Sequence, residues 1–242
     1  MNTEETPQIL TILQTGEMTL RGQFVHGSNY TFLASIFHED KEYPAVYKPV
    51  RGEQPLWDFP SGTLSGREVA AYLVSEFLGW QLVPPTVYRR KAPLGAGSVQ
   101  LYIEHDPEYH YFSFTPEDKQ RLRPVVLFDL VVNNADRKGG HILIDKNKHI
   151  WLIDHGICFH VEDKLRTVIW DFAGEPIPTD LVEDLTRLRE ELKQAGQLVE
   201  QIQPYLSPGE IRAMERRTHR LIENGCFPHP APSRRPYPWP PV

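Results

Sequence analysis

The sequence predicts an α+β protein with two lobes and a tail: a β-rich front lobe at residues 1–103, a mainly helical back lobe at 104–226, and an extended tail at 227–242. Three observations lead to this prediction. Apolar and β-branched residues alternate along the first hundred residues, which is typical of strands. Beyond residue 104 the apolar residues recur mostly at helical spacing. The final stretch contains seven prolines, which exclude a helix or a central strand there.

In the front lobe, we expect two strands around a loop within residues 19–40, a third strand at 43–50, and a further strand pair at 86–90 and 98–104. A helix is expected between them, at 65–80. Ser65 is its expected N-cap, because Glu68 follows at the spacing of a capping box.

In the back lobe, Thr115 and the proline after it predict the start of a long helix that runs to about residue 134, with a kink at Pro124. Residues 141–153 alternate around a polar turn and predict a β-hairpin. Helical periodicity returns at 180–194 and 207–225.

Composition excludes several classes of protein. The chain is 40% hydrophobic and 24% charged, as in an ordinary globular protein, and no apolar run approaches the length of a membrane span. A net charge of −6 argues against nucleic acid or anionic membrane as the main partner. Two cysteines imply no disulfide framework, and the acidic, polar N-terminus is unlike a secretory signal, so we expect a cytoplasmic protein without integral membrane association.

Two aspartates flank the predicted hairpin. Asp136 precedes its first strand, Asp154 follows its second, and His141 lies between them. Because neighbouring strand ends lie side by side, these groups are expected to converge, as ligands of a hard cation or as a proton acceptor. The alternative is structural: Asp136 caps a turn and Asp154 pairs with Arg137.

The order of polar residues along the chain favours one chemistry. Lys48 lies in a predicted strand beside valines, Glu68 lies on the next helix, and a hinge-like change of composition follows residue 104. Asp136 and Asp154 come afterwards. Transfer of a phosphoryl group from ATP needs a cation on the phosphates, an acid that holds that cation, an aspartate that orients the acceptor hydroxyl and another that binds metal.

The segments "NNADRKGGHIL" and "DHG", which begins eighteen residues after Asp136, resemble the catalytic and metal loops of the phosphatidylinositol 3- and 4-kinase superfamily. The stretch "EVAAYLVSEFLGWQLVPPTVY" also resembles the type II lipid kinases and their small bacterial relatives. The resemblance implies an atypical, two-lobed kinase-like fold. It also implies that Asp136 is the catalytic aspartate, Asp154 the metal ligand and Lys48 the phosphate lysine, with Glu68 as its partner. Glu76, which flanks the apolar stripe of the same helix, is the alternative partner.

The chain departs from the family pattern at three places. His141 stands where the family has a metal-binding Asn, and imidazole suits Mn²⁺ better than Mg²⁺. Lys138 replaces a family His. The segment expected to cover the phosphates has only Gly22 and Gly27, and we assign Gly27 to nucleotide binding.

These features predict an ATP-dependent phosphotransferase that uses Mg²⁺ or Mn²⁺, held by Asp154 and His141, and that binds adenine near four residues: Leu101, Tyr102, Ile103 and Glu104. The acceptor is not identified, but the absence of a strongly basic face favours a protein or small molecule over a lipid. The alternatives are a catalytically inactive nucleotide-binding regulator, transfer of AMP, and a zinc hydrolase that uses His141, His155 and His160 with the two aspartates. The tail is suited to bind a partner, to dock on the back lobe or to link subunits.

Overall fold

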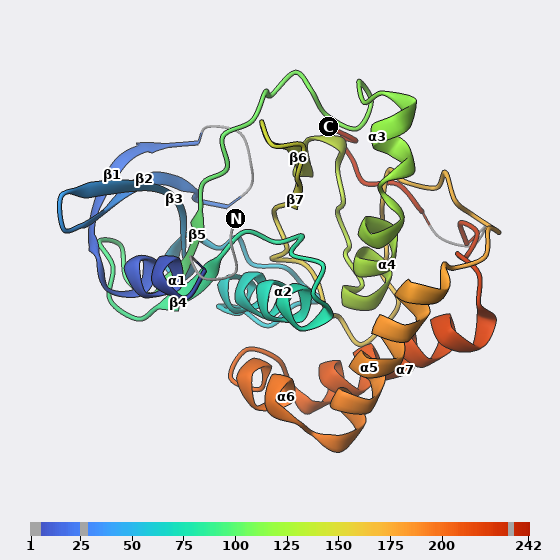
Figure 1. Cartoon of the computed structure of the whole chain (residues 1–242). Coiled ribbons are helices and arrows are strands. Elements are labelled where there is room, and N and C mark those ends of the chain that lie inside the picture. The colour runs from blue at the N-terminus through green and yellow to red at the C-terminus, as the bar shows by residue number, and fades with distance from the viewer. Residues whose placement is uncertain (1–5, 25–28, 232–234) are drawn as a thin grey trace.

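The computed structural model describes residues 6–24, 29–231 and 235–242, and the chain folds as the predicted α+β protein (Figure 1). The first hundred residues form a five-stranded antiparallel sheet with the order β1-β2-β3-β5-β4. The elements of this part of the chain are α1 (Thr6–Thr15), β1 (Glu17–Gln23), β2 (Phe32–His38), β3 (Lys41–Pro49), η1 (Val50–Gly52), α2 (Leu64–Leu78), β4 (Thr86–Arg89) and β5 (Gly97–Leu101). The predicted strand pair at 86–90 and 98–104 is confirmed.

Alternation along β3 gives the sheet two different faces. Ala45 and Tyr47 are fully buried, and they belong to a cluster that α1 completes with Ile12 and Leu13. The alternate residues, Val46 and Lys48, point to the opposite face because successive side chains of a strand alternate. Helix α1 was not predicted from the sequence, and it is the element that covers the first face of the sheet.

Helix α2 begins differently from the prediction. Its N-cap is Thr63, which makes no side-chain capping bond, so the capping box of Ser65 and Glu68 is wrong. The carboxylate of Glu53 instead accepts hydrogen bonds from the backbone N–H groups of Leu64 (3.2 Å) and Ser65 (2.8 Å). A carboxylate from a preceding segment thus satisfies the free N–H groups of the first turn. Glu68 is left free for a different contact.

The described residues of the back lobe form eight further elements. These are α3 (Pro116–Gln120), α4 (Arg123–Val132), η2 (Gly139–His141), the antiparallel hairpin β6 (Ile142–Ile144) and β7 (Ile150–Leu152), α5 (Thr179–Gln194), α6 (Gln197–Ile202) and α7 (Pro208–Asn224). The hairpin and the N-cap at Thr115 are confirmed. The predicted kinked helix is instead two helices. Pro124 has no N–H to donate to the preceding turn, so the helix is interrupted at residues 121–122 instead of continuing with a kink.

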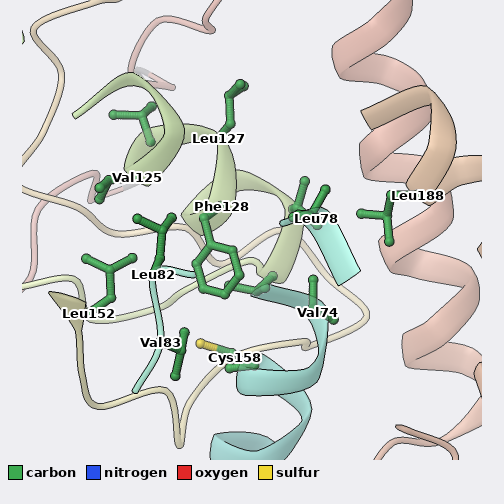
Figure 2. Packing of buried hydrophobic residues seen from close by; sticks show 14 of the residues in the cluster. Val74, Leu78, Leu82, Val83, Val125, Leu127, Phe128, Leu152, Cys158 and Leu188 are labelled. Atoms are coloured by element: carbon green, nitrogen blue, oxygen red, sulfur yellow. The ribbon is translucent and has the colours of Figure 1, made fainter. Parts of the chain in front are cut away.

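The larger hydrophobic cluster joins the two lobes. Phe128 of α4 lies at its centre with no exposed surface, and Figure 2 shows it among Val74 of α2, Leu152 of β7 and Cys158. Leu188 of α5 closes the cluster from the other side of α2. Helix α2 therefore packs in the back-lobe core although it belongs to the predicted front lobe. The division of the chain at residue 103 stays a prediction.

The tail docks on the back lobe. From the end of α7 it returns along the lobe, so that the C-terminus lies beside the start of β6 (Figure 1). The backbone N–H of Thr167 donates to the carbonyl of Pro236 (3.0 Å), and that of Gly139 donates to the carbonyl of Pro241 (2.8 Å). Docking on its own lobe was one of the three positions left open for this segment. Within the described residues no helix is long and apolar enough to cross a membrane.

Candidate active site

Lys48 of β3 joins the two lobes through two carboxylates. Its ammonium group contacts Glu68 Oε1 of α2 and lies 2.9 Å from Asp154 Oδ1, which follows β7. Burial alone would lower the pKa of Lys48, but the charges of Asp154 and Glu68 outweigh it and raise the pKa above its usual value. The lysine is therefore charged at neutral pH.

Glu68 has a second contact that fixes its place. Its Oε2 accepts a hydrogen bond of 2.9 Å from the backbone N–H of His155, and the side chain is only 4% exposed. One carboxylate thus links a strand of the sheet to the loop after β7. Glu76, the alternative partner for Lys48, instead lines a separate cavity beside α1 and α6. The structure pairs Lys48 with Glu68.

Asp154 and His141 face each other across the end of the hairpin. The imidazole Nε2 lies 3.5 Å from Asp154 Oδ2, too far for a strong hydrogen bond. Burial lowers the pKa of His141 to about 4, so the ring is neutral at pH 7. The charge of Lys48 holds the pKa of Asp154 well below its usual value. Asp154 also has a φ of 63°, a left-handed conformation that aspartate tolerates better than most residues.

Asp136 lies in the loop between α4 and η2, and its side chain is 28% exposed. Its backbone N–H donates to Asn134 Oδ1 (2.9 Å), so the turn is capped by the asparagine and not by Asp136. Burial raises the pKa of Asp136 to about 6, with a further increase from the charge of Asp154, while Lys138, 3.5 Å away, opposes the rise. This carboxyl is therefore poised to exchange a proton near neutral pH.

Arg137 does not pair with Asp154, so that alternative is wrong. Its guanidinium is fully buried, and Nε and Nη2 both donate to the carboxylate of Asp129 in α4, with Nε to Oδ2 at 2.9 Å. The other terminal nitrogen donates to the carbonyls of His141 (3.2 Å) and Ile153 (2.9 Å). One arginine therefore holds the segment after Asp136, the end of η2 and the end of β7 together.

A cavity of about 440 Å³ opens between the sheet and the hairpin, within the range of small-molecule sites. Lys48, His141 and Asp154 lie on its wall. Most of the remaining wall consists of apolar or uncharged side chains: Val46, Gln100, Leu101, Tyr102, Ile103, Leu143 and Ile153. A largely apolar molecule with an anionic end fits this lining.

The structure also places the other predicted residues. Of the four residues expected at the adenine, Leu101, Tyr102 and Ile103 line the cavity, whereas Glu104 is exposed and lies outside its lining. Gly27 lies outside the described residues. Phe172, in the segment after the predicted metal loop, is buried against Phe227 and does not line the cavity.

Several residues of this site were not predicted from the sequence. Val46 and Gln100, opposite each other on β3 and β5, form the cavity floor. Leu143 and Ile153 come from the hairpin side. Strand alternation signals that Val46 shares a face with Lys48, but only the strand order brings β5 next to β3.

The zinc alternative finds no support in the geometry. In residues 6–24, 29–231 and 235–242, no three side chains of His, Cys, Asp or Glu converge to hold a metal ion by themselves. His155 Nε2 is 2.8 Å from Arg137 Nη2, and the ring of His160 packs against Phe59. These two imidazoles are engaged elsewhere.

Comparison with known proteins agrees with this geometry. The model of the family described as phosphatidylinositol 3- and 4-kinase matches residues 62–207, more than half of the chain. The chain belongs to this family. The match includes Glu68, Asp136 and Asp154, and it starts after the strand that carries Lys48.

The relatives include bacterial and plant proteins. Protein Rv2133c of Mycobacterium tuberculosis is 39% identical, over 95% of this chain and 94% of that protein. Phosphatidylinositol 4-kinase gamma 4 of rice (Oryza sativa subsp. japonica) is 30% identical, but the match covers 46% of this chain and only 23% of the plant enzyme. The chain is therefore a small bacterial-type member of the family, far shorter than the plant kinases it matches.

The fold is also found among solved kinases. The structure of the Golgi casein kinase with Mn/ADP bound matches 100% of this chain and 81% of its own, with a TM-score of 0.57 and 16% identity. At that identity the likeness shows the fold alone. It confirms the prediction of an atypical, two-lobed kinase-like fold, and family and fold together support a kinase-like phosphotransferase.

Proposed function

We propose that the protein transfers the γ-phosphate of ATP to a hydroxyl group of a protein or small-molecule acceptor. The observation that carries the proposal is the contact of Lys48 with both Glu68 and Asp154 at the wall of a largely apolar cavity. A partly buried lysine paired with a glutamate, next to an aspartate that is free to hold a metal ion, is the arrangement that phosphoryl transfer needs.

The cavity suits a purine nucleotide. The adenine lies between Val46 of the sheet and Leu143 of the hairpin, beside the backbone of Leu101–Ile103. The phosphates then point toward Lys48, which exchanges its contact with Asp154 for phosphate oxygens. Glu68 keeps the lysine in place because its other oxygen is tied to the backbone of His155.

Asp154 and His141 are the residues that would hold the divalent ion. Their facing atoms, Oδ2 and Nε2, are 3.5 Å apart, a distance at which both atoms can bind one ion. The neutral imidazole has a lone pair for this bond. A mixed oxygen and nitrogen donor set suits Mn²⁺ at least as well as Mg²⁺. Two protein ligands are few, as is usual for ions that nucleotide phosphates also bind. The ion supplies neutralisation of charge on the phosphates.

Asp136 orients the acceptor. Its carboxylate is partly exposed, so an acceptor hydroxyl can reach it, and with a pKa of about 6 it is mostly ionised at pH 7. It accepts a hydrogen bond from the hydroxyl and takes up its proton as the hydroxyl oxygen bonds to the γ-phosphorus and the bond from that phosphorus to the ADP oxygen breaks. Lys138 Nζ lies 3.5 Å from Asp136 Oδ2 and offers a positive charge next to it.

A nucleotide-binding regulator without catalysis is the second candidate, and it is favoured by His141 at the position of the family's metal-binding Asn. Both candidates predict that ATP with Mn²⁺ raises the melting temperature. The free energy of unfolding should increase by about 2.7 kcal/mol when the ligand is in hundredfold excess over its Kd. Only the kinase predicts release or transfer of labelled γ-phosphate. A protein that is stabilised but turns over no γ-phosphate is the regulator.

Asp154→Asn tests the metal site. We expect this variant to lose the Mn²⁺-dependent part of the ATP stabilisation, because an amide oxygen carries no charge to hold the ion. The measurement is the melting temperature with ATP, with and without Mn²⁺. Asp40→Asn, in the exposed turn between β2 and β3, is the control and should behave like the parent. If Asp154→Asn keeps the full response, Asp154 does not bind the ion.

A further inference from the structure

The loop that carries Asp136 contains two consecutive glycines, which leave its backbone little restricted. Gly139 and Gly140 lie between Asp136 and His141, and glycine restricts the backbone least of all residues. Neither has a side chain with which to pack. The position of the two flanking groups relative to each other therefore depends on what holds this glycine pair, in addition to the contacts of Arg137.

The glycine pair is held by two segments from outside the loop. On one side, the backbone N–H of Tyr111 donates to the carbonyl of Gly139 (3.4 Å), and a β-carbon at Gly139 would lie 2.9 Å from the ring of Phe112. On the other side, the N–H of Gly139 donates to the carbonyl of Pro241 (2.8 Å). A β-carbon at Gly140 would lie 3.9 Å from Val242 Cγ1, an ordinary contact distance, so Val242 constrains the second glycine far less than the Pro241 carbonyl constrains the first.

The tail is itself fixed next to the catalytic loop. The carbonyl of Pro236 accepts from Thr167 N–H, and residues 166–168 run parallel to Arg137, whose N–H donates to the Arg166 carbonyl (2.9 Å). The loop, this segment and the tail thus lie side by side. Four of the eight residues at 235–242 are prolines, which restrict the free tail and reduce the entropy lost on docking.

We propose that the C-terminal tail is a positioning element of the catalytic loop, with the Pro241 carbonyl holding Gly139 and thereby the relative positions of Asp136 and His141. This inference rests on the proposed function. The tail would then act on the active site of its own chain, by positioning the catalytic loop. The backbone hydrogen bonds of Pro236 and Pro241 go to Thr167 and Gly139, and neither of these residues lines the nucleotide cavity. It is therefore expected to affect the chemical step more than nucleotide binding.

Two shortened chains that differ by one residue test the proposal. Deletion of Pro241 and Val242 removes the carbonyl that Gly139 needs, whereas deletion of Val242 alone leaves it as part of the terminal carboxylate, still an acceptor. We expect the first deletion to lower kcat for γ-phosphate turnover about 10- to 100-fold, as loss of positioning does, with KM for ATP changed less than about twofold. The second deletion should stay close to the parent.

A second readout does not depend on turnover. Hydrogen exchange of the Gly139 amide, followed by NMR, should be slow in the parent and in the chain without Val242, and fast in the chain without both residues. Equal kcat and equal exchange in the two shortened chains would overturn the proposal, as would an equal loss in both. A parent that turns over no γ-phosphate contradicts the proposed function instead, and the Gly139 exchange then decides whether the tail holds the loop.

Discussion

Asp136→Asn is expected to lower γ-phosphate transfer about 10²- to 10⁴-fold while leaving the affinity for ATP unchanged. The amide keeps the shape of the side chain but cannot take up the proton of the acceptor hydroxyl. Asp136 lies outside the wall of the nucleotide cavity, so the ATP contacts survive the change. The measurements are single-turnover transfer of labelled phosphate and the melting temperature with ATP and Mn²⁺.

The same residue predicts a pH dependence. A proton acceptor acts only when it is ionised, and burial raises the pKa of Asp136 to about 6. In the parent, kcat/KM should therefore be constant above that pH and fall about tenfold per unit below it. The residual activity of Asp136→Asn should lack this acid limb. A variant that transfers phosphate at the parent rate, or that keeps the limb, would show that another group accepts the proton.

Asp129→Ala is expected to lower the free energy of unfolding by about 3–5 kcal/mol, because it leaves the Arg137 guanidinium buried without a counter-charge. Both side chains are almost completely buried, and the carboxylate also accepts a hydrogen bond of 3.0 Å from Asn134 Nδ2. A loss of this size is a large part of the stability of a typical protein. Urea unfolding measures it.

A milder substitution keeps that experiment interpretable if the alanine variant does not fold. Asp129→Asn preserves the shape and one acceptor oxygen, so its loss should be smaller than that of Asp129→Ala. Asp40→Ala, in an exposed turn, should leave the urea midpoint unchanged. An Asp129→Ala protein as stable as the parent would show that the network around Arg137 does not hold the loops in place.

The local patterns of the sequence predicted much of the fold. Alternation predicted the strand pair β4–β5 and the hairpin, and the Thr115-Pro116 pair predicted the start of α3. Helix α1 was missed because its segment is short and follows a polar N-terminus. Its apolar residues Ile9, Ile12 and Leu13 pack against the sheet, a long-range contact that local sequence patterns do not reveal.

The candidate site was predicted in its charged residues but not in their support. Most of α2 is buried, so no single apolar stripe defines its inward face and a helical wheel could not select Glu68. The ordering of Lys48, Glu68 and Asp154 along the chain was the better guide. The partner of Arg137 lies eight residues earlier in sequence, and nothing in either residue selects Asp129 over Asp154 until the loops are folded.

The account depends on Asp154 and His141 sharing an ion beneath a nucleotide in the cavity between the lobes. A crystal structure with Mn²⁺ and a non-hydrolysable ATP analogue tests this most directly, because anomalous scattering locates manganese. We predict manganese within about 2.0–2.3 Å of an Asp154 oxygen and of His141 Nε2, with the γ-phosphate between Lys48 and Asp136. Manganese bound elsewhere, or an analogue outside the cavity lined by Val46 and Leu143, would contradict the account.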